Sequence, residues 1–176
     1  ADFVTDAEAA LAYLKGRMEV DSRRIGVIGH SEGGGIAAIL GARDKDLGDV
    51  ILMAAPGVRG DRLIVAQAGA LARASGVPEG KAKEAEAIQR RIVDAVIQRN
   101  DTVLKNTLRE LVGARSDASF SQLTSPWYRY MLSLDPAPHL RGITCPILAM
   151  NGSIDTQVPA ELNLNAIREA LNTGSS

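Results

Sequence analysis

Residues 24–35, with the sequence RIGVIGHSEGGG, decide the fold of this chain. Residues 25–28 form a short apolar run, which is typical of a buried parallel strand. The run leads into a G-x-S-x-G pattern centred on Ser31, and the apolar residues 36–40 that follow predict a helix. A strand, this turn and a helix in succession predict a sharp bend with Ser31 at its tip.

The bend would hold a reactive hydroxyl group above the end of a sheet. Gly29 and Gly33 flank Ser31 and have no Cβ atom, so strand and helix can approach closely there. The amide of Glu32 would lie at the helix start, where the helix dipole favours negative charge, and is therefore a candidate oxyanion-hole donor. The alternative is a glycine-rich turn that carries a buried structural serine.

The composition excludes several classes of function. The chain has 176 residues, which fits one ordinary domain, and its net charge of −1 indicates neither a nucleic-acid nor a membrane partner. Aromatic residues make up 3%, too few for a base-stacking surface, and no apolar run is long enough for a membrane span. No cysteine and histidine cluster and no phosphate-binding loop is present, so we expect no metal and no other cofactor. The single cysteine leaves the compartment open, with the cytoplasm preferred.

Two further apolar runs predict strands that extend the sheet. They are residues 50–55 and 146–151, and the helix before the first of them makes a strand–helix–strand unit of the parallel type. A first helix is expected to begin with Thr5 as its N-cap, and a last one spans residues 162–171. The fold class is therefore α/β.

Residues 58–140 differ in character from the rest, because they are charged and helical without a convincing strand. We predict a helical lid inserted between two parts of a core, residues 1–57 and 141–176. The alternative is that these helices simply pack on the sheet.

Two helix starts stand out within this segment. Asn100 or Asp101 is a candidate N-cap, and Ser125-Pro126 has the form of a helix start with proline in the first turn. Trp127 and Tyr128 follow and are candidates for lining a substrate pocket beneath a lid. Ordinary packing is the alternative for these two rings.

Asp155 follows the third predicted strand directly. Functional groups of parallel sheets gather at the carboxyl ends of the strands, where Ser31 is also expected. A carboxylate there can orient an imidazole that activates a serine. The alternative is that Asp155 caps its own turn.

Two motifs resemble those of the α/β-hydrolase superfamily, namely GHSEGG at residues 29–34 and MNGSIDTQVP at residues 150–159. They are similar to the branch of bacterial esterases, dienelactone hydrolases and prolyl-oligopeptidase-like enzymes. The resemblance implies that Ser31 is the nucleophile and Asp155 the triad acid, with a small ester or acyl compound as substrate. It also implies a partial α/β-hydrolase fold, with a few parallel strands, flanking helices and a helical lid insertion.

The histidines depart from this family pattern. The catalytic histidine of the family follows the acid, whereas the two histidines here, His30 and His139, both precede Asp155. His30 adjoins the nucleophile on a turn where neighbouring side chains diverge, and His139 should lie near the opposite edge of the sheet, so we expect structural roles for both. The early strands of the family are also missing, so the chain resembles a hydrolase truncated at both ends. We therefore expect negligible esterase turnover from this chain alone.

Three functions stay open at this point. The chain is a serine hydrolase of esterase type, a non-catalytic remnant that acts by self-association or partner binding, or a fragment of a prolyl-oligopeptidase-like peptidase. The strand at residues 25–28 has no predicted neighbour on one side, and a bare parallel edge favours pairing with another chain. We therefore expect a homo-oligomer that covers this edge.

Overall fold

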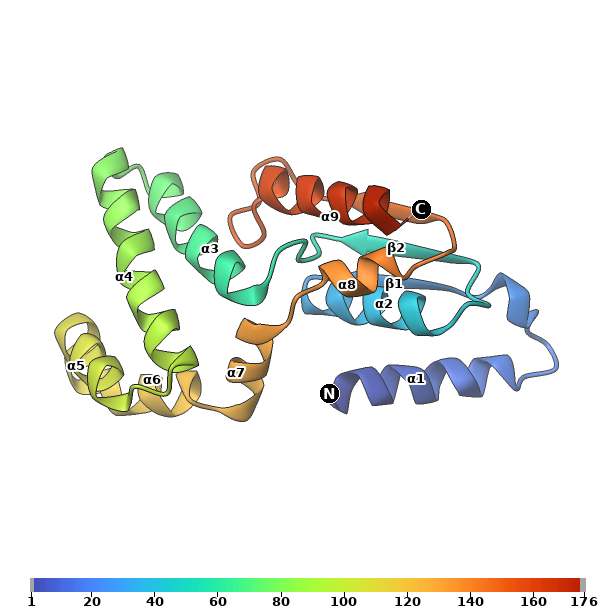
Figure 1. The fold of residues 1–176 in the computed structure, drawn as a ribbon, viewed down its shortest axis with the longest axis horizontal. Coiled ribbons are helices and arrows are strands. Elements are labelled where there is room, and N and C mark those ends of the chain that lie inside the picture. Colours follow the sequence, from blue (N-terminus) through green and yellow to red (C-terminus); the bar gives the residue numbers. More distant parts are fainter. Residues whose placement is uncertain (1, 175–176) are drawn as a thin grey trace. The chain divides into compact units, whose positions relative to one another are not determined.

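The computed structural model describes residues 2–174, which divide into two compact units. The sheet unit runs to Val58 and resumes at Asp135, and the helical unit comprises Arg59–Leu134. Figure 1 shows the elements of both units in chain order. The helical unit is thus an insertion between two strands of the sheet unit.

The sheet unit alternates strands and helices, as expected for parallel strands. Its elements are α1 (Asp2–Lys15), a 3-10 turn η1 (Ser22–Arg24), β1 (Gly26–His30), α2 (Glu32–Arg43), β2 (Asp49–Met53), α8 (Ala137–Arg141), β3 (Ile147–Met150) and α9 (Ala160–Gly174). The strands are parallel in the order β1-β2-β3, with Val50 opposite Val27 on one side and Ile147 on the other. The α/β class and the three predicted strands are confirmed.

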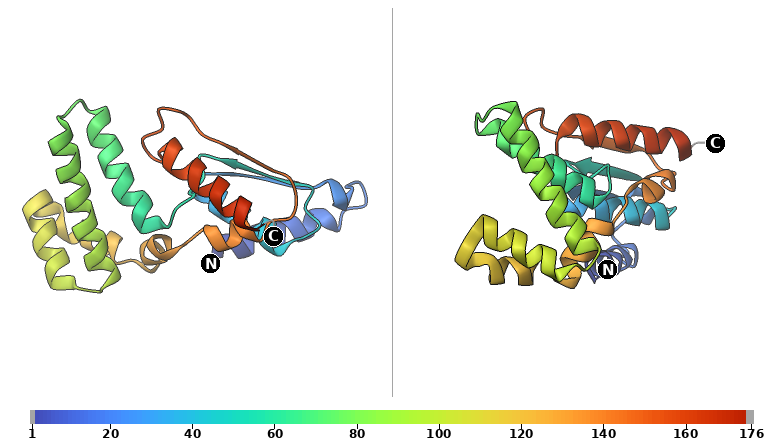
Figure 2. Two further views of the ribbon diagram at one scale, coloured as in Figure 1. Left: turned by 45° about the horizontal axis from the view of Figure 1, so that its top comes forward. Right: turned by 60° about the vertical axis from the view of Figure 1, so that its left-hand side comes forward.

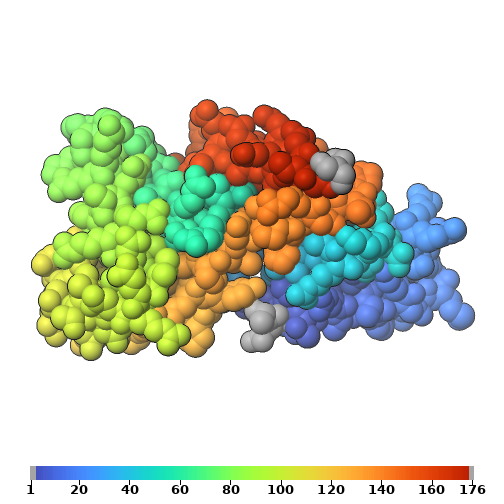
Figure 3. Space-filling model, in the orientation of Figure 1, coloured from blue at the N-terminus to red at the C-terminus, as the bar shows by residue number. Residues whose placement is uncertain are grey.

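One face of the sheet carries the core of this unit. Val50 and Leu52 are fully buried there, and they belong to one apolar cluster with residues of α1, α2, α8 and α9. Helix α8 contacts both α2 and α9 and lies between them (Figures 1 and 2). In the space-filling view its orange side chains fit against the red α9 and the cyan α2 (Figure 3).

The opposite face of the sheet is exposed. Ile28 is 65% exposed and Leu148 is 51% exposed. The register aligns two rows of side chains on this face, Ile28 with Ile51 and Leu148, and His30 with Met53 and Met150. The predicted burial of these strands is therefore wrong for one of the two faces, because the helices of this unit pack on the other.

The helical unit has its own core. Its elements are α3 (Gly60–Ala74), α4 (Glu79–Ile97), α5 (Asp101–Val112), a 3-10 turn η2 (Gly113–Arg115), α6 (Ser116–Leu123) and α7 (Pro126–Ser133). Leu104 and Leu132 are fully buried in an apolar cluster that draws on α4, α5 and α7. The Gly60 amide donates a hydrogen bond to the Leu134 carbonyl over 3.0 Å, so the two ends of the insertion lie side by side.

Both helix starts predicted in this unit are confirmed by their caps. The Asn100 side chain accepts a hydrogen bond from the Val103 amide at 3.1 Å, and the Ser125 hydroxyl accepts one from the Tyr128 amide at 3.2 Å. The N-cap predicted at Thr5 is wrong, because α1 already begins at Asp2. An N-cap residue stands immediately before the first turn of a helix, whereas Thr5 lies inside α1.

The unit boundaries differ slightly from the predicted segments. Residues 135–140 were expected in the insertion, but they belong to the sheet unit, because Leu140 of α8 is buried in its core. Whether the helical unit acts as a lid stays a prediction. Within residues 2–174, no helix is both long and apolar enough to cross a membrane.

Candidate active site

Ser31 stands between the last residue of β1 and the first residue of α2. Its backbone has φ 54° and ψ −122°, a conformation that L-residues rarely adopt and that costs about 1 to 3 kcal/mol. The residue is half-buried, and its hydroxyl makes no capping hydrogen bond to the helix that it precedes. The bend predicted from the G-x-S-x-G pattern is therefore present, and its strain lies at the serine.

The surrounding backbone holds this strained residue in place. The Ser31 amide donates to the Met53 carbonyl at the end of β2 over 3.0 Å, and the Gly34 amide donates to the Ser31 carbonyl over 2.9 Å. A Cβ atom on Gly29 would lie 2.1 Å from the Gly33 carbonyl oxygen, so this position accepts only glycine without a rearrangement. Strand and helix are thus in close backbone contact on the strand side of the turn.

The second close approach falls one residue later than predicted. A Cβ atom on Gly33 would meet nothing within 4 Å, whereas one on Gly34 would lie 2.3 Å from the Cβ atom of Ala55. The sequence prediction for Gly33 is therefore wrong. Through Gly34, helix α2 packs closely against Ala55 in the loop that follows β2.

Glu32, the first residue of α2, is exposed. Its amide lies at the positive end of the helix dipole, a place that favours a developing negative charge. This position agrees with the oxyanion-hole role inferred from the sequence, which stays a prediction.

Asp155 lies in the loop that follows β3, on the carboxyl side of the same sheet as Ser31. Its Oδ1 atom accepts hydrogen bonds from the Gln157 amide at 2.8 Å and from the Val158 amide at 3.0 Å. The turn-capping role weighed for this residue is therefore real. Both of these hydrogen bonds use the same carboxylate oxygen. As a triad acid, Asp155 would use its other oxygen, and this role stays a prediction.

The loop around Asp155 is held by Asn151, a residue of the MNGSIDTQVP motif for which no role was predicted. The Asn151 side-chain amide donates to the Val158 carbonyl over 2.7 Å. Its Oδ1 atom is buried and accepts no hydrogen bond from the described residues.

Neither histidine hydrogen-bonds to the Ser31 hydroxyl within residues 2–174. His30 is the exposed last residue of β1. Burial lowers the pKa of His139, and the positive charge of Arg43 lowers it further. Arg43 ends α2, and the 12 residues of this helix span about 18 Å from the Ser31 end. His139 therefore lies near the end of α2 that is remote from Ser31.

The two aromatic residues proposed for substrate binding belong to the helical unit. Trp127 is 44% exposed, whereas Tyr128 is buried in the core of this unit, and their ring centroids lie 6.2 Å apart. Burial raises the pKa of the Tyr128 phenol. Tyr128 thus packs within its unit, and a contact of either ring with substrate stays a prediction.

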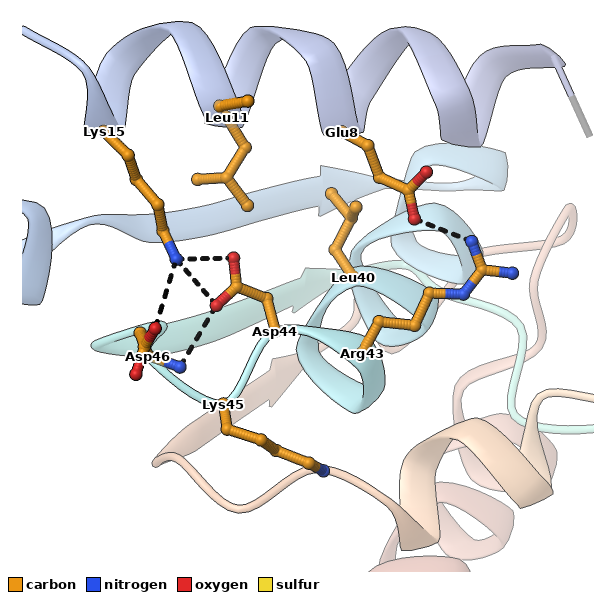
Figure 4. A pocket seen from close by; sticks show the side chains of 9 residues that line it. Glu8, Leu11, Lys15, Leu40, Arg43, Asp44, Lys45 and Asp46 are labelled. Carbon is orange, nitrogen blue, oxygen red and sulfur yellow. Dashed lines mark hydrogen bonds and ion pairs between the residues drawn. The ribbon is translucent and has the colours of Figure 1, made fainter.

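A pocket of about 350 Å³ opens between α1 and the C-terminal end of α2 (Figure 4). Lys15 pairs with Asp44 at 2.7 Å, and Arg43 pairs with Glu8 at 2.7 Å, so charges along its walls neutralise one another. The pocket lies at the opposite end of α2 from Ser31 and is no candidate for the substrate site. In the described part of the chain, no group of three or more histidine, cysteine, aspartate or glutamate residues could hold a metal ion.

Comparison with known protein families identifies the family of this chain. Residues 1–170 match the family described as X-Pro dipeptidyl-peptidase (S15 family), whose members are serine peptidases of the α/β-hydrolase type. The match supports the superfamily and a partial α/β-hydrolase fold, but not the esterase and dienelactone-hydrolase branch. A search of curated proteins found no match. Because the match covers nearly the whole chain, the protein belongs to the X-Pro dipeptidyl-peptidase (S15) family of serine hydrolases.

Proposed function

We propose that this chain provides the nucleophile and the acid of a serine hydrolase that forms an acyl-enzyme on Ser31. The observation that carries the proposal is the strained backbone of Ser31, with φ 54°, at the junction of β1 and α2. Strain of this kind persists only where the surrounding structure enforces it, and it concentrates at functional sites. The family match supports the same conclusion for the chain as a whole.

The reaction would proceed through standard acyl transfer. The Ser31 oxygen attacks a substrate carbonyl carbon while its proton moves to an imidazole, and the Glu32 amide donates to the oxygen that becomes negative. The protonated imidazole then gives its proton to the leaving amine or alcohol, and water hydrolyses the ester on Ser31. Asp155 orients the imidazole through the carboxylate oxygen that its own turn does not engage.

The substrate class that we favour is peptidic. The sequence motifs favoured an ester substrate, with peptide as an alternative, whereas the family that matches the chain is named for cleavage after X-Pro dipeptides. An ester and an amide share the acyl-enzyme route, so Ser31 and Asp155 would serve either. Comparison of Gly-Pro p-nitroanilide with p-nitrophenyl butyrate, each in the presence of added imidazole, distinguishes the two. Only Ser31-dependent release counts in this comparison, and preference for the p-nitroanilide supports the peptidase.

The nucleophile is tested by covalent labelling with a fluorophosphonate probe, followed by peptide mapping. The proposal predicts an adduct on Ser31 that forms faster when imidazole is added and that is absent from Ser31→Ala. Ser121→Ala, which removes an exposed serine of α6, should label as the unaltered chain does. An adduct elsewhere, or none at all in imidazole, would contradict the proposal.

A second candidate is a non-catalytic protein of this family that acts by association. It is favoured by the position of the two histidines, since neither is hydrogen-bonded to Ser31 in the described residues. Ser31-dependent labelling in imidazole argues for the enzyme, and its absence argues for this second candidate.

A further inference from the structure

The Asn163 side chain connects two loops of the sheet unit. The residue lies in the first turn of α9 and is fully buried. Its Oδ1 atom accepts a hydrogen bond from the Gly57 amide at 2.9 Å, and its Nδ2 atom donates to the Pro159 carbonyl at 2.9 Å. Both ends of one carboxamide are thus used, and each end holds a different loop.

The first of these loops, residues 54–57, adjoins the nucleophile. Ala54 has a positive φ of 45° and its amide donates to the Met150 carbonyl over 2.9 Å. A Cβ atom on Gly34, in the first turn after Ser31, would lie 2.3 Å from the Cβ atom of Ala55. The first turn of α2, directly after Ser31, therefore packs against this loop.

The second loop, residues 151–159, carries the candidate acid. Val158 is bonded to two other residues of this loop. The Val158 amide donates to Asp155 at 3.0 Å, and the Val158 carbonyl accepts from Asn151 at 2.7 Å. Pro159 follows directly, and its carbonyl accepts two hydrogen bonds from Asn163, one from the side chain at 2.9 Å and one from the backbone amide at 3.2 Å. A displacement of Pro159 would therefore move the turn that orients the Asp155 carboxylate.

We propose that Asn163 is a positioning residue that keeps the Asp155 loop in register with the loop that supports Ser31. This inference rests on the proposed function, because it assigns the two loops to one active site. The role needs a buried donor and a buried acceptor on one short side chain, and asparagine supplies both. Aspartate would keep the acceptor but not the donor, and leucine would lose both.

The positioning itself is tested by amide hydrogen exchange, measured by NMR at Gly57, at Val158 and, as a reference, at Leu52 in the core of β2. In Asn163→Leu, exchange at Gly57 and Val158 should accelerate by roughly three- to tenfold more than at Leu52. In Asn163→Asp, Gly57 should keep its protection and Val158 should lose part of its protection, because the backbone hydrogen bond to Pro159 remains. Asn165→Asp places the same charge on an exposed site of the same helix and should leave the pattern unchanged. Equal acceleration at all three amides, or at none, would overturn the proposal.

The consequence for the reaction is tested by the rate of fluorophosphonate labelling of Ser31 in imidazole, at a temperature where all variants are folded. Asn163→Leu should label roughly three- to tenfold more slowly than the unaltered chain, and Asn165→Asp at the same rate. Absence of labelling in the unaltered chain would count against the proposed function, while the exchange pattern would still decide on the positioning. Equal labelling in Asn163→Leu, despite lost protection at both loops, would overturn the inferred link to the active site.

Discussion

The backbone amide of Ser31 donates a hydrogen bond of 3.0 Å to the carbonyl oxygen of Met53, the last residue of the neighbouring strand. Because Ser31 has a positive φ, its conformation must be enforced by what surrounds it. The hydrogen bond to Met53 joins the bend at Ser31 to β2, the central strand of the sheet. Ser31 is thus held in position by β2 as well as by its own strand and helix.

The strain at Ser31 predicts that glycine gives a more stable protein than alanine at this position. Ser31→Gly should unfold with a free energy about 1 kcal/mol higher than Ser31→Ala, because glycine adopts a positive φ without the clash of a Cβ atom. Chemical denaturation of both variants measures this difference. If the two variants are equally stable, the backbone at Ser31 is not strained.

Alanine substitutions at the two glycines that follow Glu32 should change the free energy of unfolding in opposite directions. Gly34→Ala should lower the free energy of unfolding by about 1 to 3 kcal/mol, because its Cβ atom would overlap that of Ala55. Gly33→Ala has open space and should raise it by up to about 1 kcal/mol through better helix propensity. Denaturant titrations of the two variants provide the comparison. A loss of stability in Gly33→Ala would contradict the open space at Gly33, and unchanged stability in Gly34→Ala would contradict the close packing at Gly34.

The helical unit should lose stability in acid through one buried carboxylate. Arg59 donates two hydrogen bonds to Asp61, which lowers the pKa of that carboxyl to about 2, and Arg90 adds a third at 3.2 Å. A carboxyl whose pKa is lower in the folded state adds stability above its unfolded pKa, and this stability disappears as the pH falls from about 4 toward 2. The expected loss is about 2 kcal/mol.

This pH dependence is checked by urea titrations of Asp61→Asn at several pH values. The variant should show a shallower fall in stability below pH ~4 than the unaltered chain, because the titrating group is gone. Asp117→Asn, which alters an exposed aspartate of α6, should keep the full dependence. If stability falls with pH in parallel for all three proteins, Asp61 is not the source of the pH dependence.

We propose, as the sequence led us to expect, that the outer edge of β1 pairs with another copy of the chain. Strand β1 ends the order β1-β2-β3, and Ile28 on its open face is 65% exposed. Light scattering should therefore report a dimer or larger assembly at high concentration.

Ile28→Lys should weaken the assembly, because a lysine on an edge strand opposes edge pairing. Met18→Lys, at a site that is fully exposed outside the strands, should not weaken it. A monomer at every concentration would contradict this expectation.

The parts of the fold that the sequence predicts correctly are those with local signals. The bend at Ser31 follows from glycines beside a strand and a helix, and the caps at Asn100 and Ser125 follow from side chains that bond within three residues. Where the signal is ambiguous, prediction fails. Thr5 has the neighbours of a capping box, yet α1 begins at Asp2.

The parts that the sequence could not predict depend on contacts between distant residues. Asn163 accepts a hydrogen bond from Gly57, 106 residues away in the chain, and no local sequence pattern predicts this contact. The choice of Gly34 rather than Gly33 for close packing depends on Ala55 from another loop. Apolar runs in strands likewise do not reveal that Ile28 lies on an exposed face.

We propose that Ser31 is positioned as a nucleophile, although neither histidine hydrogen-bonds to its hydroxyl within residues 2–174. This proposal is tested most directly by the rate of p-nitrophenyl ester hydrolysis in buffer without imidazole and then with it, for the unaltered chain and for Ser31→Ala. We expect equal rates for the two proteins without imidazole, and a faster rate for the unaltered chain once imidazole is present. Ser31-dependent turnover in the absence of imidazole, or equal rates of the two proteins in its presence, would overturn this proposal.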